Sequence, residues 1–222
     1  MIELKDLSHT YRQGDENIDV LNNISIKFES NQVVGLIGPS GSGKSTLLNI
    51  LGLVQKPLMG NLKVCNILTN PLSEFEKTKI RKEMIGYISQ ESQLLEDFTC
   101  IENIAIPLLL NGLSKNHSFN SAKKIMEEFG LKKRTNFKPS LLSGGERQRI
   151  SVLRALVKKP KILLADEPTG SLDDKNARLV MDYIFNLSKK FKTLCIIATH
   201  NLSFISNFDF CYEISNSKLN KL

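Results

Sequence analysis

The sequence has no apolar stretch long enough to cross a membrane. Its longest strongly apolar run extends from Ala105 to Leu110 and contains Pro107, whereas a membrane-spanning helix needs roughly 20 such residues. The segment from Met1 to Asp6 also lacks the charged and then apolar layout of a secretory signal. We therefore expect a cytoplasmic protein.

Cysteine and histidine are few and widely spaced. No two of the four cysteines form a C-x-x-C pair, and the three histidines are equally scattered. Disulfide frameworks and zinc sites depend on such close spacing, so the sequence favours neither, and we expect the cysteines to be small apolar residues kept reduced. These residues are Cys65, Cys100, Cys195, Cys211, His9, His117 and His200.

The net charge of +7 comes partly from three basic clusters, Lys132–Arg134, Lys158–Lys161 and Lys189–Lys192. Such clusters can contact nucleic acid, contact an anionic membrane surface, or be solvated helix ends. They lack the interleaved aromatic residues of a nucleic-acid platform. We favour solvated helix ends, keep attraction to anionic lipid as the alternative, and expect no nucleic-acid partner.

Apolar patterning predicts an α/β fold in which a parallel sheet is interrupted by a helical insertion. The 222 residues suffice for one substantial domain, and no repeat or linker divides them. The predicted strands are Ile2–Leu7, Ile24–Phe28, Val33–Ile37, Ile85–Ser89, Ile162–Ala165 and Leu194–Ala198. The predicted helices are Lys44–Leu51, Ser73–Glu83, Ile101–Leu110, Ser118–Phe129, Gly145–Val157 and Lys175–Lys189.

The sharpest motif is a glycine-rich segment that matches G-x-x-x-x-G-K-[ST] in full. It follows an apolar run and precedes a helical pattern, which is the context of a phosphate-binding loop. Glycines allow backbone N–H groups to point at phosphate oxygens, and the helix adds its free amides. We expect Lys44 to bind the β- and γ-phosphates and Ser45 to bind Mg²⁺. The residues expected to hold the nucleotide here are Gly38, Pro39, Ser40, Gly41, Ser42, Gly43, Lys44, Ser45 and Thr46.

Two acidic residues, Asp166 and Glu167, end the apolar run Ile162–Ala165. Ligands gather at the carboxyl ends of parallel strands, and neighbours on an extended segment point opposite ways. We therefore expect Asp166 to bind Mg²⁺, directly or through water, and Glu167 to orient and polarise the attacking water. Gln90 and His200 also follow strands. We expect Gln90 to reach the metal or the water, and His200 to sense the γ-phosphate.

A second anion site is predicted at Ser143, Gly144 and Gly145. Ser143 and Glu146 have the spacing of a capping box, so a helix should begin here and present free amides to phosphate. One chain would then carry two phosphate-binding helix ends. We interpret this as a head-to-tail pair of copies, in which the segment Ser143–Gly145 of one copy covers the γ-phosphate held by the other. ATP would join the pair, and hydrolysis would release it.

The order and context of these motifs resemble those of ABC ATPases over nearly the whole chain. The motifs are Gly38–Ser45, Gln90, Leu142–Glu146, Asp166–Glu167, Ser171–Asp173 and His200. The resemblance implies one domain over residues 1–222, with a P-loop NTPase core of parallel sheet, an antiparallel β subdomain and a helical subdomain inserted at about 91–157. It also implies that Tyr11 stacks on adenine and that Asp173 lies at the dimer interface. ATP and Mg²⁺ are the implied cofactors, and two integral membrane permease subunits are implied to contact the Gln90 region and the helical insertion.

A narrower likeness indicates the lipoprotein-releasing group of ABC ATPases. It is carried by Gln13–Glu16, Leu94–Thr99, Glu102–Leu109, Gly144–Arg149 and Ala165–Gly170. It implies that ATP hydrolysis drives release of lipoproteins from the inner membrane toward the outer membrane. The cargo would pass through the permeases, and the chain would lie at the cytoplasmic face of the inner membrane. Two features depart from the group: Asn201, where Asp is frequent, and the short Asn- and Lys-rich tail after Phe210.

Relatives with the same active site leave alternatives open. A cell-division-type regulatory ATPase and a macrolide- or peptide-export ATPase share most of these motifs. A soluble ABC ATPase acting on ribosomes or DNA is disfavoured, because those proteins usually have two fused ATPase domains or a long inserted arm, and neither fits in 222 residues.

Overall fold

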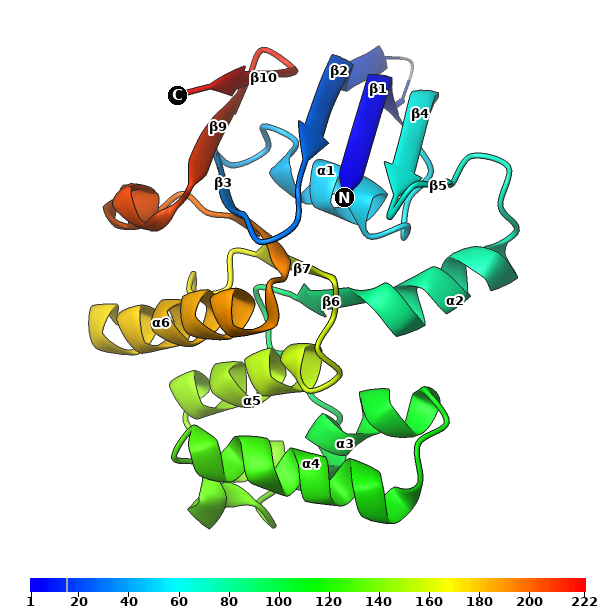
Figure 1. Ribbon diagram of the computed structural model, residues 1–222. Coiled ribbons are helices and arrows are strands. Elements are labelled where there is room, and N and C mark those ends of the chain that lie inside the picture. The colour runs from blue at the N-terminus through cyan, green and yellow to red at the C-terminus, as the bar shows by residue number, and fades with distance from the viewer. Residues whose placement is uncertain (15) are drawn as a thin grey trace.

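The computed structural model describes residues 1–14 and 16–222, and the described residues form two β-sheets with helices packed beneath and between them (Figure 1). Within the predicted stretch Gln13–Glu16, Asp15 and the side chain of Gln13 lie outside the described part. The strands are β1 (Ile2–Gln13), β2 (Glu16–Phe28), β3 (Val33–Ile37), β4 (Met59–Val64), β5 (Ile67–Leu68), β6 (Ile85–Ile88), β7 (Ile162–Asp166), β8 (Leu194–Ala198), β9 (Phe210–Ser215) and β10 (Lys218–Lys221). The helices are α1 (Lys44–Leu51), α2 (Glu74–Met84), α3 (Cys100–Leu110), α4 (Lys115–Glu128), α5 (Gly144–Leu156) and α6 (Asp174–Phe191), with short 3₁₀ turns at Lys132–Arg134, Pro139–Leu141 and Leu202–Asn207.

The larger sheet has the strand order β10-β9-β3-β8-β7-β6, and its pairs are parallel except β10 with β9. Every residue of β3 and β8 is buried. Alternate residues of the central strands enter two different cores: Leu163 and Cys195 pack with the helices below the sheet, and Leu164 and Ile196 pack with α1 and the first sheet. Continuous apolar runs are therefore required here, and the predicted parallel sheet is confirmed.

The smaller sheet is antiparallel, with the order β2-β1-β4-β5. The hairpin β1–β2 is longer than the predicted strands, and β4, β5, β9 and β10 were not located from the sequence. The reason is visible in β2, where only Leu21, Ile24 and Phe28 are buried and the remaining positions face solvent or are partly exposed. Such strands carry little apolar periodicity, and pairing with distant strands decides that they form.

Capping side chains fix where the helices begin. The side chains of Ser73, Thr99 and Ser143 each accept a hydrogen bond from the backbone N–H three residues on. The glutamate at that third position in turn accepts one from the backbone N–H of the capping residue. The predicted start of α5 is therefore correct within one residue. The helix α4 begins three residues before the predicted Ser118, because Ser114 accepts from the His117 backbone and caps an additional turn.

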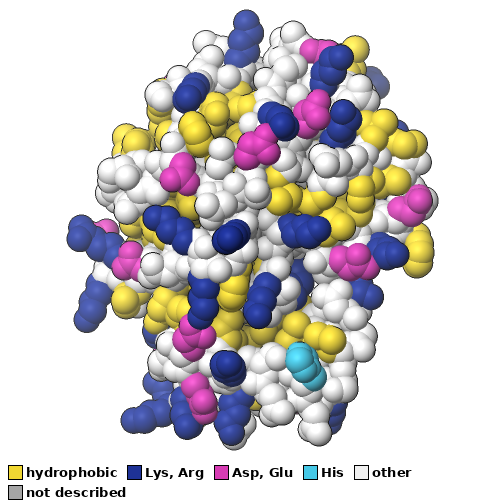
Figure 2. Space-filling view, in the orientation of Figure 1, with side chains coloured by type: hydrophobic (Ala, Val, Ile, Leu, Met, Phe, Trp, Pro, Cys, Tyr) yellow, Lys and Arg dark blue, Asp and Glu magenta, His cyan; other side chains and the backbone are white. Residues whose placement is uncertain are grey.

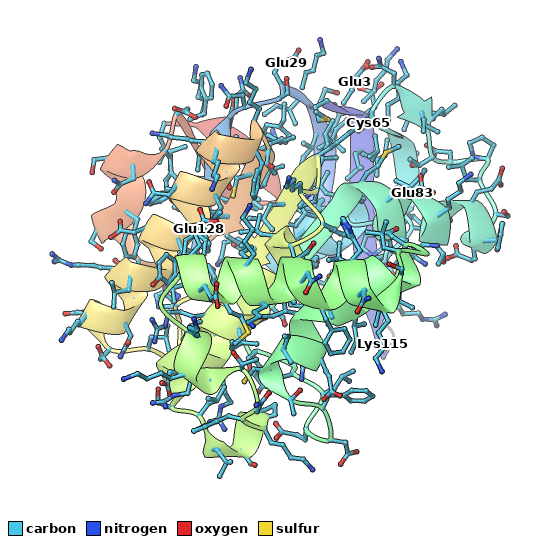
Figure 3. All side chains as sticks on the ribbon, turned by 60° about the horizontal axis from the view of Figure 1, so that its bottom comes forward. Glu3, Glu29, Cys65, Glu83, Lys115 and Glu128 are labelled. Atoms are coloured by element: carbon cyan, nitrogen blue, oxygen red, sulfur yellow. The ribbon has the colours of Figure 1, made fainter. Side chains whose placement is uncertain are left out.

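Helices α3, α4 and α5 form a group at one end of the molecule (Figure 1). Figure 3 turns this group forward and shows α4 across the front, with Lys115 at one end and Glu128 at the other. Contacts from α6 attach the Glu128 end. Tyr183 donates a hydrogen bond to the Phe129 carbonyl at 3.2 Å, its ring packs edge-on against Phe129 at 4.8 Å, and Lys190 pairs with Glu128. The helical group therefore rests on the long helix that precedes β8.

Some lysines of the basic clusters make ion pairs or hydrogen bonds within the chain. Lysine and arginine side chains are spread over the face in Figure 2, with several at the helical end. Lys132 pairs with Glu127 at 3.0 Å, and Lys158 donates to the backbone carbonyls of Arg81 and Lys82 at the end of α2, at 3.0 and 2.7 Å. The prediction of solvated helix ends therefore does not hold for Lys158, which is partly buried just after the end of α5. No helix among the described residues is long and apolar enough to span a membrane.

Lys158 provides a test of this packing through pH. Burial lowers the pKa of Lys158 to about 8 from its ordinary 10.5, so between these values the unfolded chain binds the proton more tightly than the folded chain. The stability contributed by this residue therefore rises with pH through that window, by at most about 1 kcal/mol per pH unit. Urea unfolding of the wild type and of Lys158→Met at pH 8 and 9.5 measures the difference. Identical pH dependence in the two proteins would contradict the assignment.

Candidate nucleotide-binding site

The loop between β3 and α1 borders a cavity of about 500 Å³. Two of its glycines are needed for its shape. Gly38 and Gly43 have φ values of 147° and 103°, and a Cβ there would lie 2.8 Å from the Ile214 carbonyl oxygen and 2.7 Å from the Val20 side chain. The cavity is lined by Tyr11, Val20, Ser40, Gly41, Gly43, Lys44, Ser45, Thr46, Gln90, Glu167 and His200.

Lys44 is the positive charge at the floor of this cavity. It is buried, and its Nζ donates to the carbonyls of Gly38 and Pro39 at 2.8 and 2.9 Å. The ammonium group therefore ties the end of the loop to its beginning through these two hydrogen bonds. It also lies 4.0 Å from Glu167 Oε1, so a cation and a carboxylate face the same space.

Glu167 is held in a strained backbone conformation just after β7. Its φ is 45°, a left-handed value that is uncommon for glutamate, and its N–H donates to the Ala198 carbonyl at 2.9 Å. Oε2 accepts from the His200 N–H at 3.3 Å and lies 3.0 Å from His200 Nδ1. The carboxylate is 13% exposed, whereas the His200 side chain is 66% exposed. Glu167 thus points into the cavity, and His200 lies at its mouth.

Asp166 carries a partly buried carboxylate whose charge is incompletely compensated. Burial raises its pKa and the neighbouring Glu167 adds to the effect, while a Ser45 hydrogen bond and the Lys44 charge act in the opposite direction. Among the described residues, Asp166 Oδ1 has no hydrogen-bond partner. A buried, unpaired carboxylate oxygen beside a serine hydroxyl suits a hard cation such as Mg²⁺, which prefers oxygen ligands.

Gln90 lies directly beyond β6 and borders two cavities. One is the cavity that contains Lys44, and the other, of about 690 Å³, also includes Asp166 and Ser171. Helix α5 holds the loop that follows Gln90. Gln148 Nε2 donates to the Ser89 carbonyl at 3.1 Å, and the Arg154 guanidinium donates to the Ser92 and Gln93 carbonyls at 2.9 and 2.8 Å. The sequence gives no sign of these contacts, because the partners lie about 60 residues apart in the chain.

Tyr11 lies on β1 at the rim of the cavity that contains Lys44. Its side chain is 41% exposed, and its hydroxyl lies 3.3 Å from Thr46 Oγ1. The ring of His9 packs edge-on against it, with the centroids 4.9 Å apart. The ring is therefore packed against His9, and Tyr11 borders the cavity in which the predicted stacking on a nucleotide base would occur.

The predicted second anion site lies elsewhere on the same chain. Ser143 Oγ accepts from the Glu146 N–H at 3.3 Å, Glu146 accepts from the Ser143 N–H at 3.0 Å, and Arg134 fixes Glu146 at 2.7 Å. Gly144 lines a separate cavity of about 360 Å³ with Ser171. Of the described residues that border the Lys44 cavity, none comes from Ser143–Gly145. The predicted second anion site therefore does not border the Lys44 cavity of the same chain.

The family model described as ABC transporter matches residues 21–170, which contain the loop, the Ser143 segment and the acidic pair. The chain belongs to the ABC transporter family. Among its relatives, the lipoprotein-releasing system ATP-binding protein LolD of Rickettsia bellii is 40% identical, and the alignment covers 99% of this chain and 97% of that protein. The LolD of Nitrobacter winogradskyi is 37% identical over 100% of this chain and 95% of that protein.

A solved ABC cassette gives the same fold. The ATP-binding cassette MJ0796, in a dimeric post-hydrolysis state bound to ADP and Pi, superposes with a TM-score of 0.91. The two sequences are 34% identical, and the match covers 99% of this chain and 96% of that one. The predicted ABC ATPase fold is thereby confirmed.

This ABC cassette distributes its predicted site residues over three places. Most of the predicted loop residues line the Lys44 cavity together with Tyr11, Gln90, Glu167 and His200, whereas Gly38, Pro39 and Ser42 do not line it. Asp166 borders the neighbouring cavity with Gln90. Ser143–Gly145 begin α5. Asp173 caps α6 by accepting from the Asn176 N–H at 3.0 Å, on the surface. Their roles in the cassette remain predictions.

The Asp166→Asn variant of the cassette tests the metal assignment without turnover. Removing a partly buried, poorly compensated charge should raise the unfolding free energy of the nucleotide-free chain at pH 7, by less than about 1 kcal/mol because solvent screens part of the charge. The same change should abolish the additional thermal stabilisation that Mg²⁺ gives in the presence of ADP. Thermal melts with ADP alone, with ADP and Mg²⁺, and with neither measure both effects. A variant that retains the full Mg²⁺ response would contradict the assignment.

Proposed function

We propose that this chain is the ATP-hydrolysing subunit of an ABC transporter that releases lipoproteins from a membrane. The observation that carries the ATPase assignment is the convergence of Lys44, Glu167 and His200 on one cavity, beside the unpaired Asp166 carboxylate. The full-length similarity to LolD proteins supports the choice of lipoprotein release among transporter functions.

Each residue has a distinct role in this proposal. The loop amides and Lys44 bind the phosphates of ATP, and Ser45, Gln90 and Asp166 bind Mg²⁺, which when bound supplies positive charge to the phosphate oxygens. Glu167 accepts a hydrogen bond from the attacking water and takes its proton. His200 holds the Glu167 carboxylate and extends beyond it to the mouth of the cavity, where the terminal phosphate would lie.

Two copies complete the site in this proposal. Among the described residues, none of Ser143–Gly145 lines the Lys44 cavity, and Gly144 of the same chain borders another cavity. A second copy placed head to tail would supply that helix end and the Asp173 region. The dimeric state of the cassette MJ0796 is consistent with this arrangement.

The membrane partners and location follow from the same proposal. Residues 1–222 act as one ATPase domain, whose helical insertion at about 91–157 and Gln90 loop contact two integral membrane permeases. The pair of ATPases lies peripherally at the cytoplasmic face of the inner membrane. Lipoproteins reach the permeases and not the ATPase, so the cargo makes no contact with this chain.

Co-purification tests the proposal. A tagged Glu167→Gln chain, expressed in its own cells and purified with Mg-ATP in mild detergent, should bring with it two related permeases carrying acylated lipoproteins, identified by mass spectrometry. A cell-division or efflux permease would replace lipoprotein release by one of the alternative functions and leave the ATPase assignment intact. A ribosome, or no membrane protein at all, would overturn the transporter assignment.

A further inference from the structure

Gln55 contacts Tyr11, a residue that lines the Lys44 cavity. It lies in the turn after α1, between the phosphate-loop helix and β4, and its side chain is partly buried. This residue is absent from the predicted site and does not line the Lys44 cavity. Its side-chain amide nevertheless contacts Tyr11, which does.

One amide group joins two aromatic side chains of β1. Gln55 Nε2 lies 2.8 Å from the Tyr11 hydroxyl, and that hydroxyl lies 3.0 Å from Gln55 Oε1. On its other side, Gln55 Nε2 lies 2.7 Å from His9 Nε2. His9 is 8% exposed, and burial lowers its pKa. A neutral imidazole with an unprotonated Nε2 can accept this bond from the amide.

The contacts hold the Tyr11 ring in one orientation. The hydroxyl is fixed by Gln55 and by Thr46 of α1, and the ring makes a T-shaped contact with His9. Without them, a tyrosine that is 41% exposed on an outer hairpin would occupy several rotamers. Ordering the ring before the ligand arrives removes part of the entropy cost from binding.

We propose that Gln55 is a positioning residue for the base of the nucleotide, acting through Tyr11 and supported by His9. The ligand is a nucleoside triphosphate or diphosphate whose base stacks on the Tyr11 ring. The inference rests on the proposed ATPase function and adds to it a group outside the cavity that sets the affinity for the base. Because Gln55 does not line the cavity that contains Lys44 and Glu167, it should affect binding and leave the chemical step unchanged.

The Gln55→Met variant keeps the side-chain length and removes both hydrogen bonds. We expect the KM for ATP and the Kd for ADP to rise about three- to tenfold, the range accounted for by one ordinary hydrogen bond, with kcat unchanged. Inhibition by inorganic tripolyphosphate, which has no base, should be unaffected. The Gln55→Glu variant keeps an acceptor for the Tyr11 hydroxyl and should recover most of the ADP affinity.

Two further variants separate positioning from general damage. Gln32→Met is the matched control, because Gln32 is also partly buried and makes a side-chain bond, to the Glu29 N–H, far from the cavity. Tyr11→Phe keeps the ring and removes the hydroxyl, so it should weaken ADP binding as Gln55→Met does. The double variant should be no weaker than either single one, because both remove the same contact.

The possible outcomes distinguish this inference from the proposed function. A wild type that neither binds ADP nor hydrolyses ATP overturns the proposed function and this inference with it. A wild type that does both, with a Gln55→Met variant of unchanged ADP affinity, overturns the inference alone. The inference is also overturned if Gln55→Met weakens tripolyphosphate binding as much as ADP binding, or if Gln32→Met weakens ADP binding as much as Gln55→Met does. Either result would assign Gln55 a general structural role.

Discussion

Replacing Glu167 with Gln should lower ATP hydrolysis by about 10²- to 10⁴-fold, the contribution of a general base, and leave ATP binding intact. Gln has the same shape and can still accept from the His200 N–H, so the backbone around residue 167 should be preserved. The carboxylate that takes the proton of water is lost. Binding of ATP should be retained or strengthened, because a negative charge 4.0 Å from the Lys44 ammonium is removed.

The consequence for assembly is that Glu167→Gln should accumulate as a dimer with bound ATP. Phosphate release from labelled ATP measures turnover, and size-exclusion chromatography with light scattering measures the mass with and without Mg-ATP. Glu83→Gln is the matched control, since Glu83 is exposed on α2 (Figure 3) and does not line the cavity. Undiminished turnover, or a monomer at saturating Mg-ATP, would contradict the role given to Glu167.

The second large effect is expected at Gly144, which has no packing role within a single chain. A Cβ added at Gly144 meets no atom within 4 Å, and an Asp in the first turn of α5 complements the helix dipole. Gly144→Asp should therefore fold with unchanged stability and bind ADP normally. If Gly144 faces the γ-phosphate held by another copy, the added carboxylate repels that phosphate, and turnover should fall at least about 100-fold. Gly145 is unsuitable for this test, because a Cβ there lies 2.8 Å from the Asn176 side chain.

Mixing two inactive chains tests whether the site is shared between copies. The Lys44→Ala chain has an inactive phosphate loop and an intact Ser143–Gly145 segment. The Gly144→Asp chain has an intact phosphate loop and an inactive Ser143–Gly145 segment. In a head-to-tail dimer, the mixed pair has one intact site. A 1:1 mixture should therefore regain about a quarter of wild-type turnover, because half of the dimers are mixed and each has one working site of two. A mixture as inactive as its components, or an active Gly144→Asp chain, would overturn the two-copy site.

The nucleotide site could be predicted from sequence wherever its chemistry is local. The loop from Gly38 to Ser45 is a single segment, and its conformation is set by glycines and by the helix that follows. The acids Asp166 and Glu167 directly follow an apolar strand, so their position at the sheet edge follows from the chain order. The start of α5 is likewise local, since Ser143 and Glu146 satisfy each other.

Other parts could not be predicted, because the deciding partners lie far apart in the chain. Strands β4 and β10 have few buried residues, and pairing with β1 and β9 defines them. Arg154 could be recognised in the sequence only as a charge on an amphipathic helix, yet it is partly buried and binds two carbonyls some 60 residues away. No local pattern marks such a contact.

The sequence by itself determined the family, the parallel core and the chemistry of the phosphate loop, because these depend on residue types at fixed short spacings. Only the tertiary structure decided that Gln55 supports Tyr11 across 44 positions of the chain, and that the Ser143 helix end borders a different cavity from Lys44. Both facts depend on how the first sheet and the helical group pack against the central sheet. That packing follows from buried surfaces contributed by the whole chain, and no short segment contains it.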